Sequence, residues 1–163
     1  MTERQIRLFG DPVLKTVSDP IDEIDDGVRA LVEDLIDTVR PPGRAGVAAS
    51  QIGVNLRAFT YNVDGELGYI LNPELVELSG EPELIDEGCL SVPGLWFPTM
   101  RYPQAVARGL DLDGSEIELS GTGVMAQALQ HETDHLNGVL YLDRLDKQHR
   151  REAMKQVRES DWF

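Results

Sequence analysis

The chain has 163 residues, enough for one domain that buries roughly two-thirds of the surface its unfolded form exposes. Its 41% hydrophobic and 27% charged residues are ordinary for a globular protein, and no apolar run approaches the roughly 18 residues of a membrane span. A net charge of −14 argues against binding nucleic acid or an anionic membrane through the whole surface. With a single cysteine and no basic-then-apolar leader, we expect a cytoplasmic protein without a disulfide partner.

Hydrophobic periodicity predicts a first helix between residues 28 and 39. Apolar residues recur there at intervals of three and four, which is the spacing of one face of an α-helix. Asp25 or Asp26 can cap the first turn, and the Pro-Pro pair at 41–42 ends the helix.

Two β-hairpins are expected in the middle of the chain. Residues 57–63 and 68–78 are rich in strand-forming residues on either side of the Asp-Gly pair at 64–65. A second hairpin is expected over 104–119, with the Asp-Gly pair at 113–114 in its turn. Asp-Gly is typical of two-residue hairpin loops, because such loops need backbone conformations with positive φ.

Helical periodicity returns towards the end of the sequence. Residues 124–136 predict a second helix with Gly138 as its stop, and a third helix is expected from about Asp146 to Glu159. Helices and strands are grouped instead of alternating regularly, which favours an α+β fold over a doubly wound sheet. Because the sequence has no repeat, low-complexity segment or long linker, we expect a single domain over 1–163.

The segment His131-Glu132-Thr133-Asp134-His135 is typical of a catalytic metal site. On a helix, residues four apart lie on one face, so His131 and His135 can offer two imidazole nitrogens to one ion. Glu132 is close enough to reach a water on that ion without ligating it, as metal-assisted hydrolysis requires. The pattern fixes few positions, and the alternative is a surface helix with two solvated histidines.

A third ligand is needed, and Cys89 is the upstream candidate. The only downstream histidine is His149, whereas Cys89 follows Gly88, which permits an unusual backbone angle or close approach. A thiolate would complete a set of one cysteine and two histidines and leave one position for water. The alternative is that Cys89 is a small buried hydrophobe.

The run Gly46-Val47-Ala48-Ala49-Ser50-Gln51 combines small residues with a terminal amide. Small residues suit a backbone that lies close to another group, and the Gln51 amide could donate a hydrogen bond to a developing oxyanion. A packed turn or the start of a helix is the alternative.

Three segments, Gly46–Gln51, Glu87–Ser91 and Gln130–Gly138, together resemble the three signature motifs of the bacterial peptide deformylases, in the family's order and at similar spacing. The segment Ile6–Leu14 also resembles the family's N-terminal region, so the resemblance covers virtually the whole chain. One departure is Arg44, which stands where the family usually has a glycine, and it leaves the loop conformation and the rim of the substrate site open.

The resemblance implies a single catalytic domain in which antiparallel β-sheets surround a central metal-binding HExxH helix, with an N-terminal and a C-terminal helix. It implies a metal-dependent hydrolase that removes the N-formyl group from the formyl-methionine of newly made polypeptides and releases formate. The implied cofactor is one Fe²⁺ per chain, with Zn²⁺, Ni²⁺ or Co²⁺ able to substitute. N-formyl-methionyl nascent peptides are the implied substrates.

The resemblance also assigns roles to particular residues. It implies Cys89, His131 and His135 as metal ligands with water in the fourth position, and Glu132 as the group that takes the proton from that water. The Gln51 side chain and the Leu90 backbone N–H would hold the oxyanion.

The expected substrate contacts are Gly46, Gly88, Arg101 and Leu129. The peptide would lie as an extra strand between the Gly46 loop and the segment after Cys89. Leu129 is a candidate for an apolar methionine pocket. Arg101 is expected either on the pocket rim or as a surface arginine paired with a carboxylate, for which Glu87 is a candidate.

Other interpretations remain. A small HExxH peptidase is the nearest alternative, although it lacks a downstream third ligand, and a non-catalytic metal-binding homologue is another. A redox role for Cys89 lacks a second cysteine to resolve it. Six of the fifteen Lys and Arg lie in residues 144–158, either as a solvated helix face or as a docking surface for the ribosome.

Overall fold

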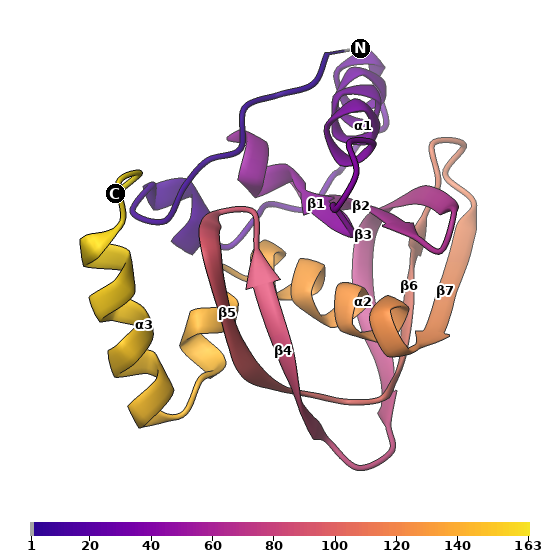
Figure 1. Cartoon of the computed structure of the whole chain (residues 1–163). Helices are drawn as coiled ribbons and strands as arrows, with labels where there is room; N and C mark the ends of the chain where they lie inside the picture. Colours follow the sequence, from indigo (N-terminus) through magenta and orange to yellow (C-terminus); the bar gives the residue numbers. More distant parts are fainter. Residues whose placement is uncertain (1) are drawn as a thin grey trace.

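A central helix lies between two antiparallel sheets, and the structure, a computed structural model, describes residues 2–163 (Figure 1). The five-stranded sheet has the order β1-β2-β3-β6-β7, and β4 and β5 form a separate two-stranded sheet. The strands are β1 (Gly46–Ala48), β2 (Ala58–Val63), β3 (Glu66–Ser79), β4 (Glu83–Cys89), β5 (Val92–Arg101), β6 (Gln104–Leu110) and β7 (Glu116–Thr122). The helices are α1 (Asp26–Val39), α2 (Gly123–Leu136) and α3 (Lys147–Glu159), with 3₁₀ turns η1 (Pro12–Lys15), η2 (Ala49–Ile52) and η3 (Tyr141–Arg144).

The three expected helices form where the sequence predicts them. Asp25, not Asp26, caps α1, because its side chain accepts a hydrogen bond from the backbone N–H of Val28. Asp146 caps α3 in the same way. Beyond α2, Gly138 takes a φ of +73°, and an added Cβ there would lie 2.7 Å from a backbone oxygen of Lys15, so only glycine fits this stop.

Both expected hairpins are confirmed. Asp64 and Gly65 join β2 to β3 with φ values of 52° and 82°, as the two central residues of a type I′ turn require. Gly114, with φ of 80°, lies in the connection between β6 and β7. The predicted α+β class with antiparallel sheets is therefore correct.

The β4–β5 hairpin is the largest element that the sequence analysis did not predict. Two prolines and two glycines between residues 83 and 101 interrupt the alternation that would indicate a strand. In the structure, Glu83 pairs with Arg101 and Cys89 with Val92, with a register shift between Glu87 and Cys89. The Gly46–Gln51 segment likewise combines the short strand β1 with the turn η2.

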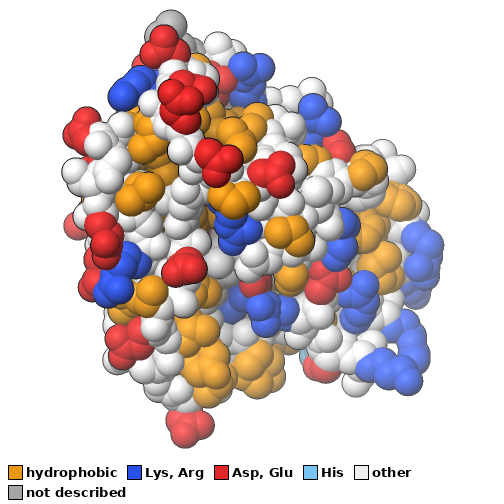
Figure 2. Space-filling model, turned by 180° about the vertical axis from the view of Figure 1, so that it is seen from behind, with side chains coloured by type: hydrophobic (Ala, Val, Ile, Leu, Met, Phe, Trp, Pro, Cys, Tyr) orange, Lys and Arg blue, Asp and Glu red, His pale blue; other side chains and the backbone are white. Residues whose placement is uncertain are grey.

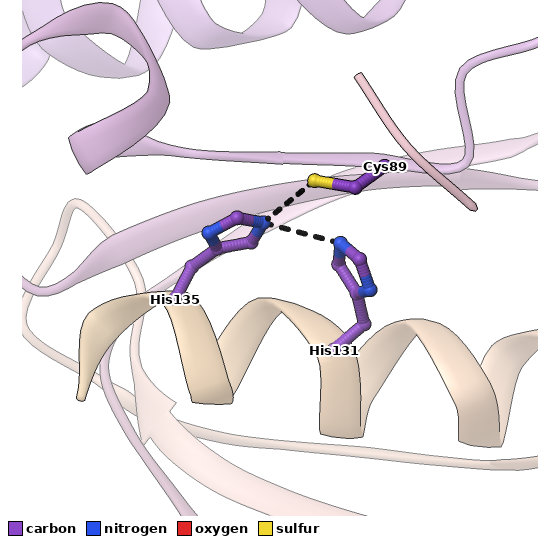
Figure 3. A group of neighbouring side chains, drawn as sticks. All are labelled: Cys89, His131 and His135. Carbon is purple, nitrogen blue, oxygen red and sulfur yellow. Dashed lines mark hydrogen bonds between the residues drawn. The ribbon is translucent and has the colours of Figure 1, made fainter. Parts of the chain in front are cut away.

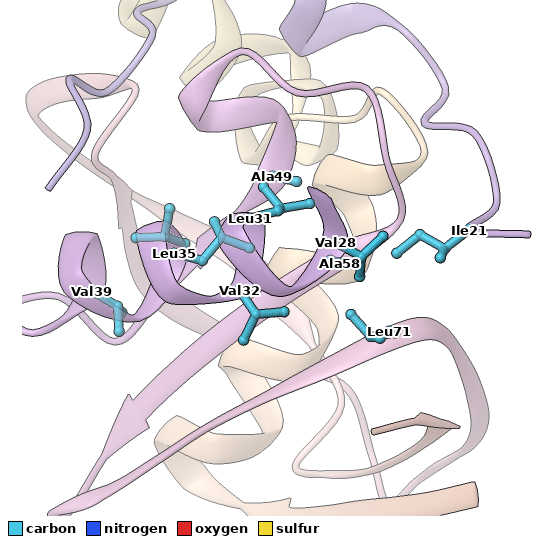
Figure 4. Close-up of a cluster of buried hydrophobic side chains, with 10 residues drawn as sticks. Ile21, Val28, Leu31, Val32, Leu35, Val39, Ala49, Ala58 and Leu71 are labelled. Carbon is cyan, nitrogen blue, oxygen red and sulfur yellow. The ribbon is translucent and has the colours of Figure 1, made fainter. Parts of the chain in front are cut away.

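The core consists of three hydrophobic clusters that hold the sheets and helices together. Figure 4 shows the first cluster, where one face of α1 packs on strands and loops of the five-stranded sheet. The second lies between that sheet and α2, and the third joins β5 to α3. The second cluster contains Ala126, Leu129 and Leu136 and so holds α2 against the five-stranded sheet. No helix within residues 2–163 has the length and apolar character needed to cross a membrane.

Candidate metal centre

Three side chains from two distant segments converge next to α2. Nε2 of His135 lies 3.4 Å from Sγ of Cys89 and 3.1 Å from Nε2 of His131, and the possible ligand atoms all lie within 4.8 Å of one another. Figure 3 shows the two imidazoles rising from one face of α2 towards the sulfur. The structure therefore brings together the three residues predicted to hold a metal.

The local fold explains this convergence. His131 and His135 are four residues apart on α2 and so share a face, whereas Cys89 is the last residue of β4, opposite that face. The register shift between Glu87 and Cys89 places Gly88 where the indole ring of Trp96 packs against its backbone. A β-bulge of this kind re-aims the strand next to a functional site.

The donor set fits a divalent transition metal. Nδ1 of His131 lies 2.7 Å from Oε2 of Glu87, and because a carboxylate accepts, Nδ1 carries the proton. With Nδ1 engaged by Glu87, Nε2 of His131 is the ring nitrogen available to bind a metal, and it lies next to Nε2 of His135. One sulfur and two imidazole nitrogens are ligands that Fe²⁺, Co²⁺, Ni²⁺ and Zn²⁺ all accept.

A buried network of charged side chains contacts His131 on its Nδ1 side, away from Cys89 and His135. Arg101 donates from Nε and Nη2 to the two oxygens of Glu87 at 2.8 and 2.6 Å, and from Nη1 to Asp134 at 2.8 Å. Arg144 donates to both oxygens of Asp134, at 2.5 and 2.7 Å. Burial alone would raise the pKa of Glu87, but hydrogen bonds from Arg101 and His131 outweigh it and lower that pKa to about 2. The network therefore holds Glu87 as an anion and keeps His131 in one orientation.

Glu132 lies beside the three converging side chains. Its Oε2 is 3.9 Å from Nε2 of His131, and its Oε1 is buried without a hydrogen-bond partner among residues 2–163. Burial raises the pKa of Glu132 to about 7, against the opposing charge of His131. A nearby cation would lower this pKa, since opposite charge favours the carboxylate. A carboxyl group that titrates near neutrality can both take and return a proton at the working pH.

Gln51 points its amide nitrogen at the same centre. Its Oε1 accepts a hydrogen bond from the backbone N–H of Ala48, which leaves Nε2 directed at Oγ of Ser91 at 3.1 Å and Sγ of Cys89 at 3.8 Å. The side chain is buried, so this donor is held in place. It can donate to negative charge that develops beside the sulfur.

A cavity of about 520 Å³ opens onto these groups. Of the expected residues, Gly46, Gln51, Gly88, Cys89, Leu90, His131 and Glu132 line it. The cavity is large enough for a side chain the size of methionine together with part of a peptide backbone.

Two expected substrate contacts lie elsewhere. Leu129 is fully buried in the hydrophobic cluster between α2 and the five-stranded sheet. Arg101 is buried in the charged network instead of lying on the rim or the surface, although its predicted pairing with Glu87 is present. Val124 and Ala128 line the cavity in place of Leu129. Val124 lies eight residues and Ala128 four residues before Glu132, and this helical spacing is the sequence pattern that could have identified them.

The Arg44 side chain forms a hydrogen bond with the end of α1. Its side chain lines the cavity, and its Nη1 donates to the backbone oxygen of Thr38 at 2.6 Å, in the last turn of the helix. A cation that bonds a free carbonyl at a helix C-terminus is a favourable arrangement. The arginine therefore holds the loop before β1 against α1.

Comparisons with known proteins agree with this geometry. The chain matches the polypeptide deformylase family over residues 3–151. It is 49% identical to the peptide deformylase of Acidothermus cellulolyticus over 99% of this chain and 89% of that one, and 42% identical to peptide deformylase 1 of Corynebacterium efficiens over 100% and 99%.

Solved structures show the same fold. The peptide deformylase of Legionella pneumophila superposes with a TM-score of 0.90 at 35% identity, covering 97% of this chain and 95% of that one. The enzyme of Ehrlichia chaffeensis in complex with actinonin superposes with a TM-score of 0.89 at 34% identity, covering 99% of both chains.

The α+β fold and the Cys-His-His cluster beside a buried glutamate define a metal-dependent hydrolase. With the family match over most of its length, the chain belongs to the polypeptide deformylase family. It is an enzyme that removes the formyl group from nascent formylated peptides.

Replacement of Gly46 tests how closely the segment Gly46–Gln51 approaches Glu132. An added Cβ at position 46 would lie 2.7 Å from Oε2 of Glu132, so Gly46→Ala must displace that carboxylate. If Glu132 acts in the reaction, the deformylation rate should fall about 100-fold, because small displacements of a reacting group cost that much, while metal content should be unchanged. Gly27→Ala, whose Cβ would have only a contact of 3.3 Å with Asp25, is the control. A Gly46→Ala enzyme within twofold of the wild-type rate would contradict this interpretation.

Proposed function

We propose that Cys89, His131 and His135 bind the catalytic metal and that Glu132 transfers the proton during hydrolysis of the formyl amide. The observation that carries this assignment is the convergence of the three donor atoms within 4.8 Å, beside a buried carboxyl group and at the base of a cavity. A structural site would normally use four protein ligands. Within residues 2–163 this cluster offers three, which favours a catalytic role.

The metal we propose is one Fe²⁺ per chain. The thiolate and imidazole ligands suit Fe²⁺, Zn²⁺, Ni²⁺ and Co²⁺ alike, so the choice of iron rests on the resemblance to the bacterial deformylases. When bound, such an ion acts as a Lewis acid that lowers the pKa of water from about 15.7 towards 7.

Groups of the protein carry out the proton transfer and stabilise the oxyanion. Glu132 takes the proton from the attacking water and later returns it to the leaving amine, so that formate and a free N-terminus are released. The Gln51 Nε2 amide and the Leu90 backbone N–H donate to the formyl oxygen as its negative charge develops. One such donor commonly contributes about 2.7–4 kcal/mol to the transition state.

The substrate would bind in the cavity through its backbone and its first side chain. The peptide would lie as an additional strand between the Gly46 loop and the segment of β4 and its turn that contains Gly88 and Leu90. The methionine side chain would pack against Val124 and Ala128, which line the cavity on the same side of α2 as Glu132. Backbone pairing permits many sequences beyond the first residue.

Formate release tests the assignment of Glu132. Wild-type protein prepared anaerobically with Fe²⁺ should release formate rapidly from formyl-Met-Ala-Ser, and Glu132→Gln should retain one metal per chain but lose at least about 100-fold in rate. An unformylated Met-Ala-Ser peptide should remain intact. Full activity of Glu132→Gln would exclude Glu132 as the base, and cleavage of the unformylated peptide would favour a peptidase.

We further propose that the C-terminal helix α3 docks on the ribosome in the cytoplasm, where nascent formylated chains emerge. Figure 2 shows basic side chains gathered along the edge of the molecule where α3 lies. Arg151, Lys155 and Arg158 are exposed there, so they are available to phosphate groups, in contrast to the acidic remainder of the chain.

Co-sedimentation with purified ribosomes tests this docking. The wild-type protein should sediment with ribosomes at low salt and dissociate as salt rises, because phosphate contacts release counterions. A triple Arg151→Ala, Lys155→Ala and Arg158→Ala variant should bind at least tenfold more weakly. The double variant Arg29→Ala with Arg40→Ala, which removes charge from α1 and its C-cap, should bind like the wild type. Equal binding of all three proteins would exclude docking through α3.

A further inference from the structure

The outer face of the β4–β5 hairpin carries exposed apolar side chains. Trp96 is 69% exposed, Leu84 is 61% exposed and Met100 is 49% exposed, whereas the inner face of β5 is buried. Leu84 and Met100 are directly paired across the two strands. An exposed tryptophan is costly to leave in water and commonly marks a contact surface.

Trp96 also belongs to the cavity. Its side chain lines the cavity together with Gly88, Pro93 and Leu95, whereas Leu84 and Met100 do not. The six-membered part of the indole lies against Gly88, since a Cβ added to that glycine would meet Cε3 and Cδ2 of Trp96 at 2.8 Å. The ring is therefore seated at the mouth of the cavity, over the residue that precedes Cys89.

This position matches the path of a bound peptide. If the formyl group binds beside Cys89, as proposed above, a ring packed on the preceding Gly88 lies within one or two peptide residues of it, because an extended chain advances about 3.3 Å per residue. Methionine occupies the interior of the cavity, and the following residues must leave past the rim. Among the described residues that line the cavity, Trp96 and Val124 are exposed large apolar residues, and Trp96 is the larger and the more exposed of the two.

We propose that Trp96 is a specificity-determining residue that contacts the second or third residue of the nascent peptide and favours apolar side chains there, aromatic ones above all. Rings that stack or meet edge to face gain affinity beyond that of the buried area alone. This proposal rests on the proposed function, because it assumes that the cavity binds a formyl-methionyl peptide.

Kinetics with three tripeptides test the proposal. Formyl-Met-Ala-Ser, formyl-Met-Phe-Ser and formyl-Met-Ala-Phe would be compared with wild-type enzyme and with Trp96→Ala and Trp96→Phe. For the wild type, kcat/KM for the better phenylalanine peptide should exceed that for formyl-Met-Ala-Ser by about 3- to 10-fold. The gain should appear mainly in KM, because this contact forms before the reaction and persists through it.

The variants distinguish a direct contact of Trp96 with the peptide from a general change in enzyme activity. Trp96→Ala should reduce the preference ratio to about one, and Trp96→Phe should retain most of it. Leu84→Ala removes an exposed apolar side chain from the same face but outside the cavity lining, so it should keep both the wild-type rate and the wild-type ratio.

Three outcomes would overturn the proposal. A preference that survives in Trp96→Ala would exclude the tryptophan as its source, and an equal loss in Leu84→Ala would show that the effect is not local. If Trp96→Ala instead converted a dimer into a monomer without changing the ratio, this face would be an interface between two copies. Absence of formate release from any peptide by the wild type would mean that the proposed function itself had failed.

Discussion

The rest of the site depends on the hydrogen bonds that the buried carboxylate of Glu87 accepts. Its two oxygens bind the guanidinium of Arg101, and one of them also accepts from Nδ1 of His131. Glu87 therefore joins the β4–β5 hairpin to α2 through charge-assisted hydrogen bonds shielded from water. Loss of either partner would leave an uncompensated charge in the interior, which is strongly destabilising.

This constraint links the fold to the chemistry. Cys89 follows Glu87 by two residues, so the strand that orients His131 also carries the proposed third ligand to the same point. Asp134 and Arg144 extend the network to the turn before α3, and the charges of the two carboxylates and two guanidinium groups balance. Because Glu87 holds Nδ1 of His131, Nε2 faces the cluster before any ion arrives. This order reduces the entropy lost when a metal binds.

The sequence predicted those elements that are determined locally. The Asp-Gly turns, the helix caps and the HExxH spacing depend on residues within a few positions of one another, and all three appear in the structure. The β4–β5 hairpin was not predicted because prolines and glycines interrupt its strand pattern, and the burial of Arg101 depends on contact with the distant helix α2. Leu129 was expected in the cavity because it is apolar and near the histidines. In the structure, α2 is rotated so that Leu129 faces the core against the five-stranded sheet, whereas Ala128 lines the cavity.

The most direct test of the account is the metal affinity of Glu87→Gln, measured by competition with a chelator while circular dichroism verifies that the protein is folded. The substitution keeps the shape of the side chain but removes the charge that fixes His131, so the dissociation constant should rise about 10- to 100-fold. Glu83→Gln, an exposed change on the same strand, should leave it unaltered. A folded Glu87→Gln protein with wild-type metal affinity would contradict the claim that this carboxylate organises the metal centre.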